Sequence, residues 1–511
     1  MLALLLAALD ASHAHDSHPR TADGWVDGTA TPAWSDLTAI VPYTHPTLGD
    51  GYAAFLDESN VLYFLQGHAP DNGWLPLATI AEDGRGLALA VSEGTLYVGG
   101  HFWAEIPGEA GAWGSLAYRA FSLGAYVPED DTVQPVIAAC EGTEAGCSGI
   151  VHALLSVDGA DALTGLWAAG SGLFDGSALS PVVQVFGGAT PAAGLGAGPS
   201  GATPLASGLI TAHALAVGPD PAATDGRRVL FATGAFAEDG TFGVALYDPA
   251  PARPAGAPAT DLDADEDHWY PVGGGFSWSG NCPSAGSFGS VCVDRPGQAL
   301  AFFQGLVYVA GDFPSDTTGL ALGGFARWDG SAWAGVAGLG AGAAPFLPVD
   351  DGYTRLAADG DTALYVGTLA ESFDTTPASS GVVGWDGIQA FSVGGGLHID
   401  DTLGSTTPAW IRALLVDPAG QLIAGGTCTL GGVVPDGAVL STLDLASTLG
   451  FGVWSAAQMC PTDLDDSGDT AAPDLALLLA AWGAAEGDVN ADGTTDAADL
   501  SAVLAAWGSC P

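Results

Sequence analysis

The stretch LALAVSEGTLYVGGHF, residues Leu87–Phe102, decides the prediction of the fold. An apolar run is followed by a turn that contains Gly, and a second apolar run ends in small residues. Short apolar runs bounded by turn residues are typical of buried β-strands. The stretch therefore predicts two adjacent strands of a sheet that is covered on both faces.

The same pattern recurs along the chain. Clear copies begin at Leu87, Ala212, Gln298, Thr354 and Ile411, with a weaker copy from Val151 and a doubtful one from Tyr52. A third short strand follows several copies, as in FARWDG from Phe325 and VVGWDG from Val382. Units of four short strands, spaced by roughly 55–75 residues, are typical of β-propeller blades. The sequence thus predicts a mainly β fold in which residues 35–455 form a six- or seven-bladed β-propeller.

These units resemble degenerate kelch-like propeller repeats of secreted and cell-surface proteins. The resemblance rests on a strand, a second strand that ends in Gly-Gly, and a Trp/Tyr-Asp-Gly turn. It implies that the Trp and Gly-Gly positions pack between neighbouring blades, and that the propeller is a rigid surface for binding or display.

A second, closer repeat lies near the C-terminus. PTDLDDSGDTAAPDLALLLAAWG, residues 461–483, aligns without a gap with GDVNADGTTDAADLSAVLAAWG, residues 487–508. Each copy is an acidic loop that runs into an apolar stretch. In the second loop, oxygen-bearing side chains alternate around Gly493, a spacing that wraps oxygen ligands around one calcium ion. Two acidic turns that cap two helices are the alternative explanation.

The predicted calcium ligands come from both loops. In the second loop they are Asp488, Asn490, Asp492, the Thr494 carbonyl, Asp496 and Asp499. In the first, weaker loop they are Asp463, Asp465, Ser467, the Asp469 carbonyl and Asp474. One loop and helix cannot bury an apolar face alone, so the two helices are expected to pack on each other through Leu, Val, Trp482 and Trp507.

The paired loop–helix pattern resembles the EF-hand-like type I dockerin domains, which are calcium-folded modules of secreted bacterial proteins. The resemblance implies a small all-α calcium-binding domain over residues 460–511, after the propeller. It also implies attachment to a cohesin-like or envelope protein.

A candidate ligand site lies on the predicted first strands. His152, His213, Gln298 and Arg412 each come directly before Ala-Leu, and Arg355 falls one position off. Since the first strand of a blade lines the central channel, we expect these side chains to converge at one end of it. There they would hold an anionic ligand or sugar hydroxyls, such as those of a polysaccharide or another cell-surface ligand. The alternative is that polar residues merely mark where each strand emerges into solvent.

Composition restricts the possible partners. The chain of 511 residues has 58 acidic and 10 basic residues, a net charge of -48, and every basic residue is Arg. A surface this negative repels phosphate backbones, so nucleic acid is not an expected partner. Without Lys, Walker-type phosphate loops and Schiff-base chemistry are excluded. The acidity favours divalent cations, and biased codon usage is a second explanation for it.

The cysteines and the N-terminus predict export. Short-range pairs in a Gly-rich chain read as disulfides, with other pairings left open. The expected pairs are Cys140–Cys147, Cys282–Cys292 and Cys460–Cys510, which leave Cys428 over. Residues 1–14 contain the apolar run LALLLAAL and small residues for cleavage after Ala14, as in a signal peptide, although the basic n-region is missing. We therefore expect a secreted, extracellular or cell-surface protein with no transmembrane segment in the mature chain.

No catalytic motif stands out. The chain has neither His-Glu-x-x-His nor a Gly-x-Ser-x-Gly elbow, and paired carboxylates of glycosidases are defined in space rather than in sequence. The sequence favours a non-enzymatic binding or display propeller that is assembled through a dockerin-like tail. The alternatives are a dockerin-borne glycoside hydrolase or lyase that acts on polysaccharide, and a structural envelope component.

Overall fold

The protein is described by a computed structural model in which most elements are strands. It describes residues 25–26, 37–56, 61–66, 74–80, 83–110, 116–138, 149–174, 179–187, 211–223, 226–238, 241–249, 269–277, 297–336, 339, 354–368, 379–400, 406–418, 420–428, 430–431, 446–447, 451–455, 462, 464, 469–483, 489 and 495–509.

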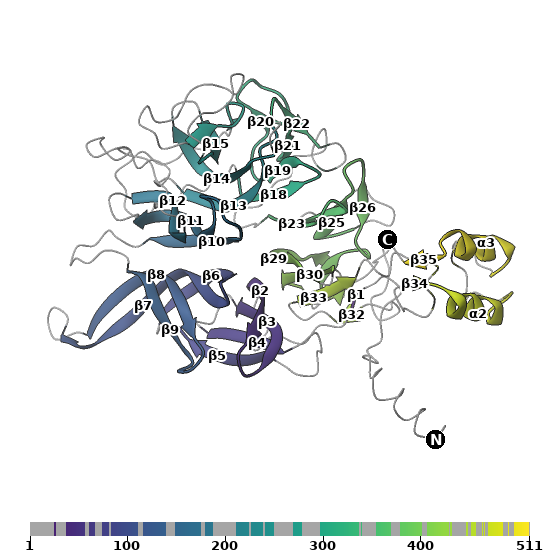
Figure 1. Ribbon diagram of the computed structural model, residues 1–511, viewed down its shortest axis with the longest axis horizontal. Helices are drawn as coiled ribbons and strands as arrows, with labels where there is room; N and C mark the ends of the chain where they lie inside the picture. The colour runs from purple at the N-terminus through teal and green to yellow at the C-terminus, as the bar shows by residue number, and fades with distance from the viewer. Residues whose placement is uncertain are drawn as a thin grey trace.

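Seven innermost strands form a closed ring around a central axis (Figure 1). They are β2 (Leu37–His45), β6 (Asp83–Ser92), β10 (Ile150–Val157), β13 (Thr211–Pro219), β18 (Ala299–Phe303), β23 (Arg355–Asp359) and β29 (Trp410–Val416). Each inner strand contacts the next, and β29 contacts β2. The predicted β-propeller is thereby confirmed.

Each inner strand begins an antiparallel unit. The second strands are β3 (Gly49–Leu56), β7 (Thr95–Ala110), β11 (Gly165–Phe174), β14 (Arg228–Glu238), β19 (Leu306–Ala310), β24 (Ala363–Gly367) and β30 (Gln421–Thr427). The third strands are β4 (Val61–Gln66), β8 (Leu116–Val127), β12 (Leu179–Gly187), β15 (Thr241–Tyr247), β21 (Phe325–Trp328), β25 (Val382–Trp385) and β33 (Phe451–Ser455). The fourth strands are β5 (Trp74–Thr79), β9 (Thr132–Ala138), β16 (Trp269–Pro271), β22 (Trp333–Gly335), β26 (Ala390–Ser392) and β1 (Trp25–Val26).

The count of blades depends on one residue pair. Six sheets surround the axis in the described part of the chain, because a seven-stranded sheet joins the units that begin at β10 and β13. That junction is the single pair Ser171–Thr211. Counted by inner strands, the same six sheets hold seven units. Two smaller sheets lie outside this scheme: β17 (Phe276–Ser277) with β20 (Ser315–Asp316), and β27 (Leu397–Asp400) with β28 (Thr406–Pro408), β31 (Leu430–Gly431) and β32 (Ala446–Ser447).

The first unit differs from the prediction. The doubtful repeat from Tyr52 is not a first and second strand; it forms β3 and β4, the second and third strands. The inner strand is β2, whose sequence LTAIVPYTH escapes the pattern because Pro42 and polar Thr and Tyr positions interrupt its apolar run. This shift explains why the copies from Tyr52 and Leu87 are so close in sequence.

Strand β1 closes the ring. Trp25 pairs with Trp454 and Val26 with Val453, so a segment from before the predicted boundary at residue 35 completes the last unit. A side-chain contact joins the same two ends of the propeller: the hydroxyl of Tyr52 donates to Oδ2 of Asp417 over 2.8 Å in a buried position. The first and last units are therefore held by both backbone and side chains.

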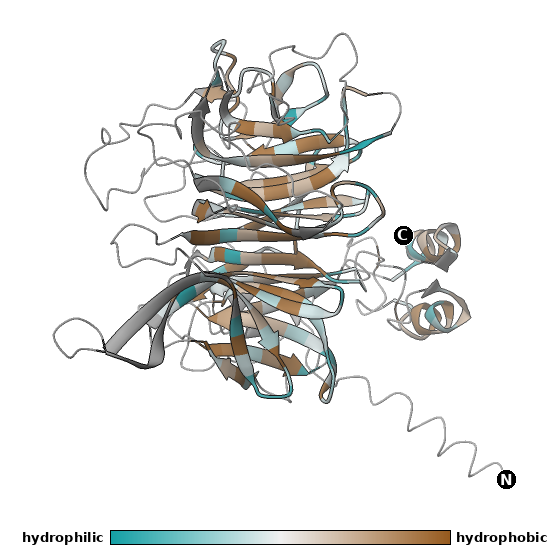
Figure 2. Ribbon diagram, turned by 60° about the vertical axis from the view of Figure 1, so that its left-hand side comes forward, coloured by the Kyte–Doolittle hydropathy of each residue, from teal (hydrophilic) through white to brown (hydrophobic). Residues whose placement is uncertain are grey.

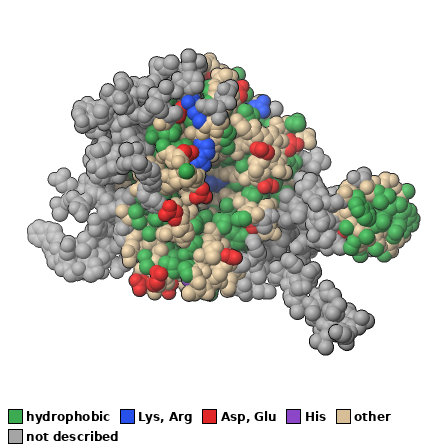
Figure 3. Space-filling model, viewed as in Figure 1, with side chains coloured by type: hydrophobic (Ala, Val, Ile, Leu, Met, Phe, Trp, Pro, Cys, Tyr) green, Lys and Arg blue, Asp and Glu red, His purple; other side chains and the backbone are tan. Residues whose placement is uncertain are grey.

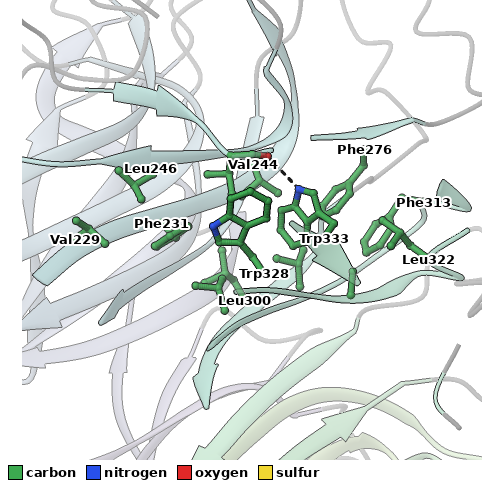
Figure 4. Packing of buried hydrophobic residues seen from close by; sticks show 14 residues of the cluster. Val229, Phe231, Val244, Leu246, Phe276, Leu300, Phe313, Leu322, Trp328 and Trp333 are labelled. Carbon is green, nitrogen blue, oxygen red and sulfur yellow. Dashed lines mark hydrogen bonds between the residues drawn. The ribbon is translucent and has the colours of Figure 1, made fainter. Parts of the chain in front are cut away.

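The core is divided among the joints between units. Seven clusters of buried apolar residues occur among the described residues, and each draws on neighbouring units. Figure 2 shows the corresponding alternation of hydrophobic and polar positions along the strands. In the cluster of Figure 4, Phe276 stacks on Phe313 with ring centroids 3.9 Å apart, and Trp333 donates its Nε1–H to the Val272 carbonyl over 3.1 Å. Such aromatic anchors bury a large area at each joint.

Beyond the propeller lie two short helices, α2 (Ala472–Ala480) and α3 (Ala497–Ala505), with a small clasp of β34 (Asp469–Thr470) and β35 (Gly508–Ser509) (Figure 1). Leu478 and Val503 are fully buried, as expected for a shared core. Trp482 and Trp507, however, are 49% and 50% exposed, so the expected packing around both Trp rings is wrong. No helix in the described part of the chain combines the length and the apolar character needed to cross a bilayer.

Candidate functional site

Seven side chains converge at one end of the central channel. They line a small cavity, about 60 Å³ in volume, and come from all seven inner-strand segments: Thr38, Leu87, His152, His213, Gln298, Arg355 and Arg412. We call this set the channel ring. The four residues singled out in the sequence therefore lie together, as does Arg355.

A β-bulge places most of the ring. In five inner strands the pairing with the second strand skips one residue, and that extra residue belongs to the ring. The skipped positions are Thr38, Leu87, His152, His213 and Arg412. A bulge inserts a residue that has no partner across the ladder and re-aims its side chain. The repeated bulge thus directs one side chain per unit into the channel.

Glycines on the second strands make room for these bulges. A Cβ added at Gly170 would overlap the Ile150 carbonyl, and one at Gly234 would overlap the Thr211 carbonyl. The overlapping atoms are backbone, which cannot move aside cheaply. In the Gly99–Gly100 pair, a Cβ at Gly100 would overlap the Arg85 carbonyl, whereas one at Gly99 would meet the Val151 side chain of the next unit. One Gly of this pair therefore permits the bulge and the other permits packing between blades.

Hydrogen bonds between units fix part of the ring. Oε1 of Gln298 accepts from the backbone N–H of Thr354 over 2.9 Å, which leaves its amide group as the donor. Arg355 donates from Nε to the Arg412 carbonyl over 2.8 Å and from Nη1 to the Thr354 carbonyl over 3.1 Å. Because the Gln298–Thr354 and Arg355–Arg412 bonds each join neighbouring units, the propeller framework holds these side chains in place.

The His pair and Thr38 complete the polar lining. The rings of His152 and His213 lie edge to face with centroids 5.1 Å apart. Thr38 is only 7% exposed, and its Oγ1 is buried without a hydrogen-bond partner among the described residues. A buried hydroxyl that lacks a partner costs free energy unless a ligand or water bonds to it.

The charge of the ring contrasts with that of the chain. Two of the 10 Arg lie among these seven residues, and none of the seven is acidic. Elsewhere Arg side chains tie turns together: Arg227 contacts Asp220 at 3.0 Å and Asp248 at 3.2 Å, and Arg228 contacts Asp161 at 2.9 Å. Figure 3 shows Arg side chains near the middle of one face, with carboxylates scattered around them. The ring is thus a locally cationic site in an acidic protein.

Sequence reasoning missed two members of the ring. Leu87 occupies the position before Ala-Leu that drew attention to the polar residues, but its apolar side chain carried no chemical signal. Thr38 precedes Ala-Ile in the inner strand that was not identified. The shared position within the repeat, rather than residue type, is the signal that finds both.

The tail presents two buried carboxylates. Asp474 and Asp499 are fully buried, and each accepts a hydrogen bond from the backbone N–H of the N-cap residue of its helix. The N–H of Ala471 donates to Asp474 Oδ2 over 2.6 Å, and those of Asp496 and Val489 donate to Asp499 over 2.7 and 2.9 Å. Asp496 caps α3 through a 2.7 Å bond from the Ala498 N–H. Capping therefore accounts for part of the acidic pattern, as the alternative explanation requires.

Capping and calcium binding are compatible at these residues. Two inward carboxylates in an all-oxygen donor set fit the hard cation calcium. No group of three metal-ligating side chains gathers within the described part of the chain. The backbone of Asp469 lies in β34. The other predicted ligands fall outside the described residues: Asp463, Asp465, Ser467, Asp488, Asn490, Asp492 and Thr494. Calcium binding stays a prediction.

The segments that predict export are also outside the described residues. They are residues 1–14 and the cysteines of the three expected disulfides, Cys140, Cys147, Cys282, Cys292, Cys460 and Cys510. Cys428, the cysteine left over, is buried in an apolar cluster with Tyr365 and Trp454. There it packs as a small hydrophobic residue.

Comparisons with known proteins show little sequence kinship. No protein-family model and no curated protein matches the chain. Among solved structures, the chain is similar to one in the mitotic checkpoint complex, at 13% identity and a TM-score of 0.37, over 86% of this chain and 96% of that one. It is also similar to YCF48 bound to D1 peptide, at 10% identity and a TM-score of 0.39, over 84% and 95%. A glucose dehydrogenase follows, at 13% identity and a TM-score of 0.32, over 78% and 94%. No argument about function rests on such distant similarities.

Proposed function

We propose that the protein is a secreted, non-enzymatic binding module whose propeller holds a polar ligand in the channel ring. One observation carries the proposal: seven units each contribute one side chain to a single cavity, five of them through the same bulge. Sites for ligands are concave and place a few polar groups at one point. The rigid ring of blades keeps those groups in position before the ligand arrives.

In this proposal the C-terminal residues attach the propeller to a partner. Calcium neutralises the acidic loops and fixes the two helices, as the dockerin resemblance implies. The attachment surface is apolar, because Leu477, Leu479, Trp482, Leu504 and Trp507 are 45–53% exposed. Exposed apolar patches of this kind mark interaction sites. A cohesin-like or envelope protein is the partner we propose for it.

A second candidate function is a polysaccharide-degrading enzyme. One observation favours it: a His pair faces the same cavity as two Arg side chains, and His is the commonest general base. The two functions differ in product. An enzyme releases reducing ends or unsaturated sugars from a polysaccharide in a reaction that His152→Asn or His213→Asn abolishes, whereas a binding module retains the polysaccharide unchanged.

The test of the binding function is retention on immobilised acidic and neutral polysaccharides. Wild-type protein is compared with the triple variant His152→Ala/His213→Ala/Arg412→Ala, after thermal unfolding shows that the variant is folded. The matched control is Arg228→Gln, which also removes a positive charge but affects a turn ion pair. We expect the triple variant alone to lose retention. Equal retention of all three proteins on every polysaccharide would contradict the proposal.

A further inference from the structure

The channel ring is not uniform around its circumference. Because each inner strand contacts the next in chain order, the order around the ring is Thr38, Leu87, His152, His213, Gln298, Arg355 and Arg412. The two Arg side chains are therefore neighbours, flanked by Gln298 and Thr38. The His pair and Leu87 occupy the remaining arc. The cavity has a cationic side and an aromatic-apolar side.

The cationic side selects a planar oxyanion. A guanidinium presents its N–H groups as a rigid fork that matches a carboxylate with two parallel hydrogen bonds. The bond from Arg355 Nε to the Arg412 carbonyl orients one guanidinium within the ring. None of the seven lining side chains is acidic. A negatively charged group is consequently preferred over a neutral group of the same shape.

The size of the cavity limits how much of a ligand enters. Its volume is about 60 Å³. A carboxylate and the hydroxylated carbons beside it can contact the seven side chains in such a space, whereas a chain of several sugars cannot. The rest of the ligand therefore lies outside the cavity, and the ring contacts the end or one substituent of a larger molecule.

The remaining side chains suit a hydroxylated neighbour of that carboxylate. Thr38 Oγ1, buried and without a hydrogen-bond partner among the described residues, can bond to a ligand hydroxyl. The two imidazoles on the far arc carry nitrogens of the kind that donate to or accept from hydroxyls. Leu87, between Thr38 and His152 in the ring order, supplies an apolar surface for C–H groups. Carboxylate, hydroxyls and C–H groups on one small unit are the chemistry of a uronic acid.

We propose that the channel ring recognises the carboxylate of a uronate residue presented by a carbohydrate chain, with the carboxylate against Arg355 and Arg412. This inference rests on the proposed binding function and names its ligand class. It excludes neutral sugars as ligands of equal affinity. A free hydroxy acid shares the chemistry, and the experiment separates the two sources.

The test is calorimetric titration of the full-length protein with trigalacturonate, its fully methyl-esterified form and free galacturonate. Esterification removes the charge and keeps the sugar. We expect the acid form to bind at least roughly tenfold more tightly than the ester, because a hydrogen bond to a charged group is about two- to threefold stronger than a neutral one. We also expect tighter binding of the trimer than of free galacturonate.

Three variants assign the effect. Arg412→Gln should weaken binding of the acid form by roughly 10- to 100-fold and leave the ester unchanged. Arg412→Lys keeps the charge but loses the fork, so it should lie between. Leu87→Ala should weaken both forms equally. Equal affinity for acid and ester, or no effect of Arg412→Gln on their ratio, overturns the uronate assignment. Free galacturonate that binds as tightly as the trimer overturns the carbohydrate-chain source. If no variant of the ring changes binding of any polysaccharide, the binding function itself fails.

Discussion

The hydrogen bond between Tyr52 and Asp417 links the first and last units of the propeller, and the substitution Tyr52→Phe removes it by deleting only the phenol oxygen. The Tyr52 hydroxyl donates to Asp417 Oδ2 over 2.8 Å, and the two side chains are only 4% and 5% exposed. Burial, with the neighbouring Asp417 carboxylate, raises the pKa of Tyr52 above its ordinary value, so the hydroxyl stays protonated and keeps donating. Tyr52→Phe leaves a buried carboxylate oxygen without this donor.

The expected loss follows from the strength of such bonds. A hydrogen bond to a charged group contributes about 1.5–3 kcal/mol. For a chain of 511 residues the entropy of unfolding is on the order of 1 kcal/mol/K, so a loss of about 2 kcal/mol lowers the melting temperature by about 2 °C. The assay is differential scanning calorimetry at neutral pH.

Tyr63→Phe is the matched control, because Tyr63 lies on the neighbouring strand β4 and is half-buried. It should melt within a few tenths of a degree of the wild type. If Tyr52→Phe and Tyr63→Phe shift the melting temperature equally, the bond does not hold the ring closed. A loss confined to Tyr52→Phe, and absent when Asp417 is already replaced by Ala, supports the closure.

Three further predictions concern a joint, a bulge and the tail. His45 is buried, and its Nδ1 accepts from the N–H groups of Thr47 and Leu48 over 3.2 Å. Burial lowers the pKa of His45 below 6.5, so the unfolded chain binds more protons than the folded chain just below that pH. The melting temperature should therefore fall as the pH drops below about 6.5, and it should fall less in His45→Gln. Equal pH profiles of the two proteins would refute this reading. Gly234→Ala should destabilise the propeller by about 1–3 kcal/mol in urea unfolding and weaken ligand binding, because the new Cβ overlaps the Thr211 carbonyl opposite the His213 bulge; a variant as stable as wild type would show that the bulge does not depend on Gly. Calcium at about 100 times its dissociation constant should stabilise the tail by about 2.7 kcal/mol. The assay is far-UV circular dichroism, in which a chelator should reduce the helix signal. The double variant Asp488→Ala/Asp492→Ala should lose more calcium affinity than Asp463→Ala/Asp465→Ala. A chelator that changes neither helix content nor stability would count against calcium binding.

The propeller could be predicted because each unit repeats the same local physics. Apolar runs, Gly turns and Trp-Asp-Gly segments recur, and the Asp of each segment closes a turn: Asp329 accepts from the N–H groups of Ser331 and Ala332 over 2.8 Å. Strand β2 was missed because Pro42 and three Thr or Tyr positions break its apolar run. Strand β1 was missed because two residues carry no periodicity, and only their pairing with the far end of the chain shows their role.

The candidate site could be predicted only in part. Position within the repeat was enough to bring His152, His213, Gln298 and Arg412 together, since equivalent positions of a propeller meet at the axis. It could not show the bulge, which depends on a Gly across the ladder. Nor could it show that the side-chain oxygen of Gln298 accepts a hydrogen bond from the Thr354 backbone N–H. The Trp side chains of the tail were misjudged because apolar character alone does not distinguish a core residue from an exposed one.

Whether the channel ring is a binding site can be tested by observing its histidines. The chain has 10 His, and their imidazole signals can be followed by NMR after selective isotope labelling, with His152→Asn and His213→Asn identifying two of them. On addition of trigalacturonate we expect the His152 and His213 signals to shift, while those of buried His45 and His398 stay in place. Binding that leaves both ring histidines unshifted, or that shifts His45 and His398 equally, would contradict this expectation.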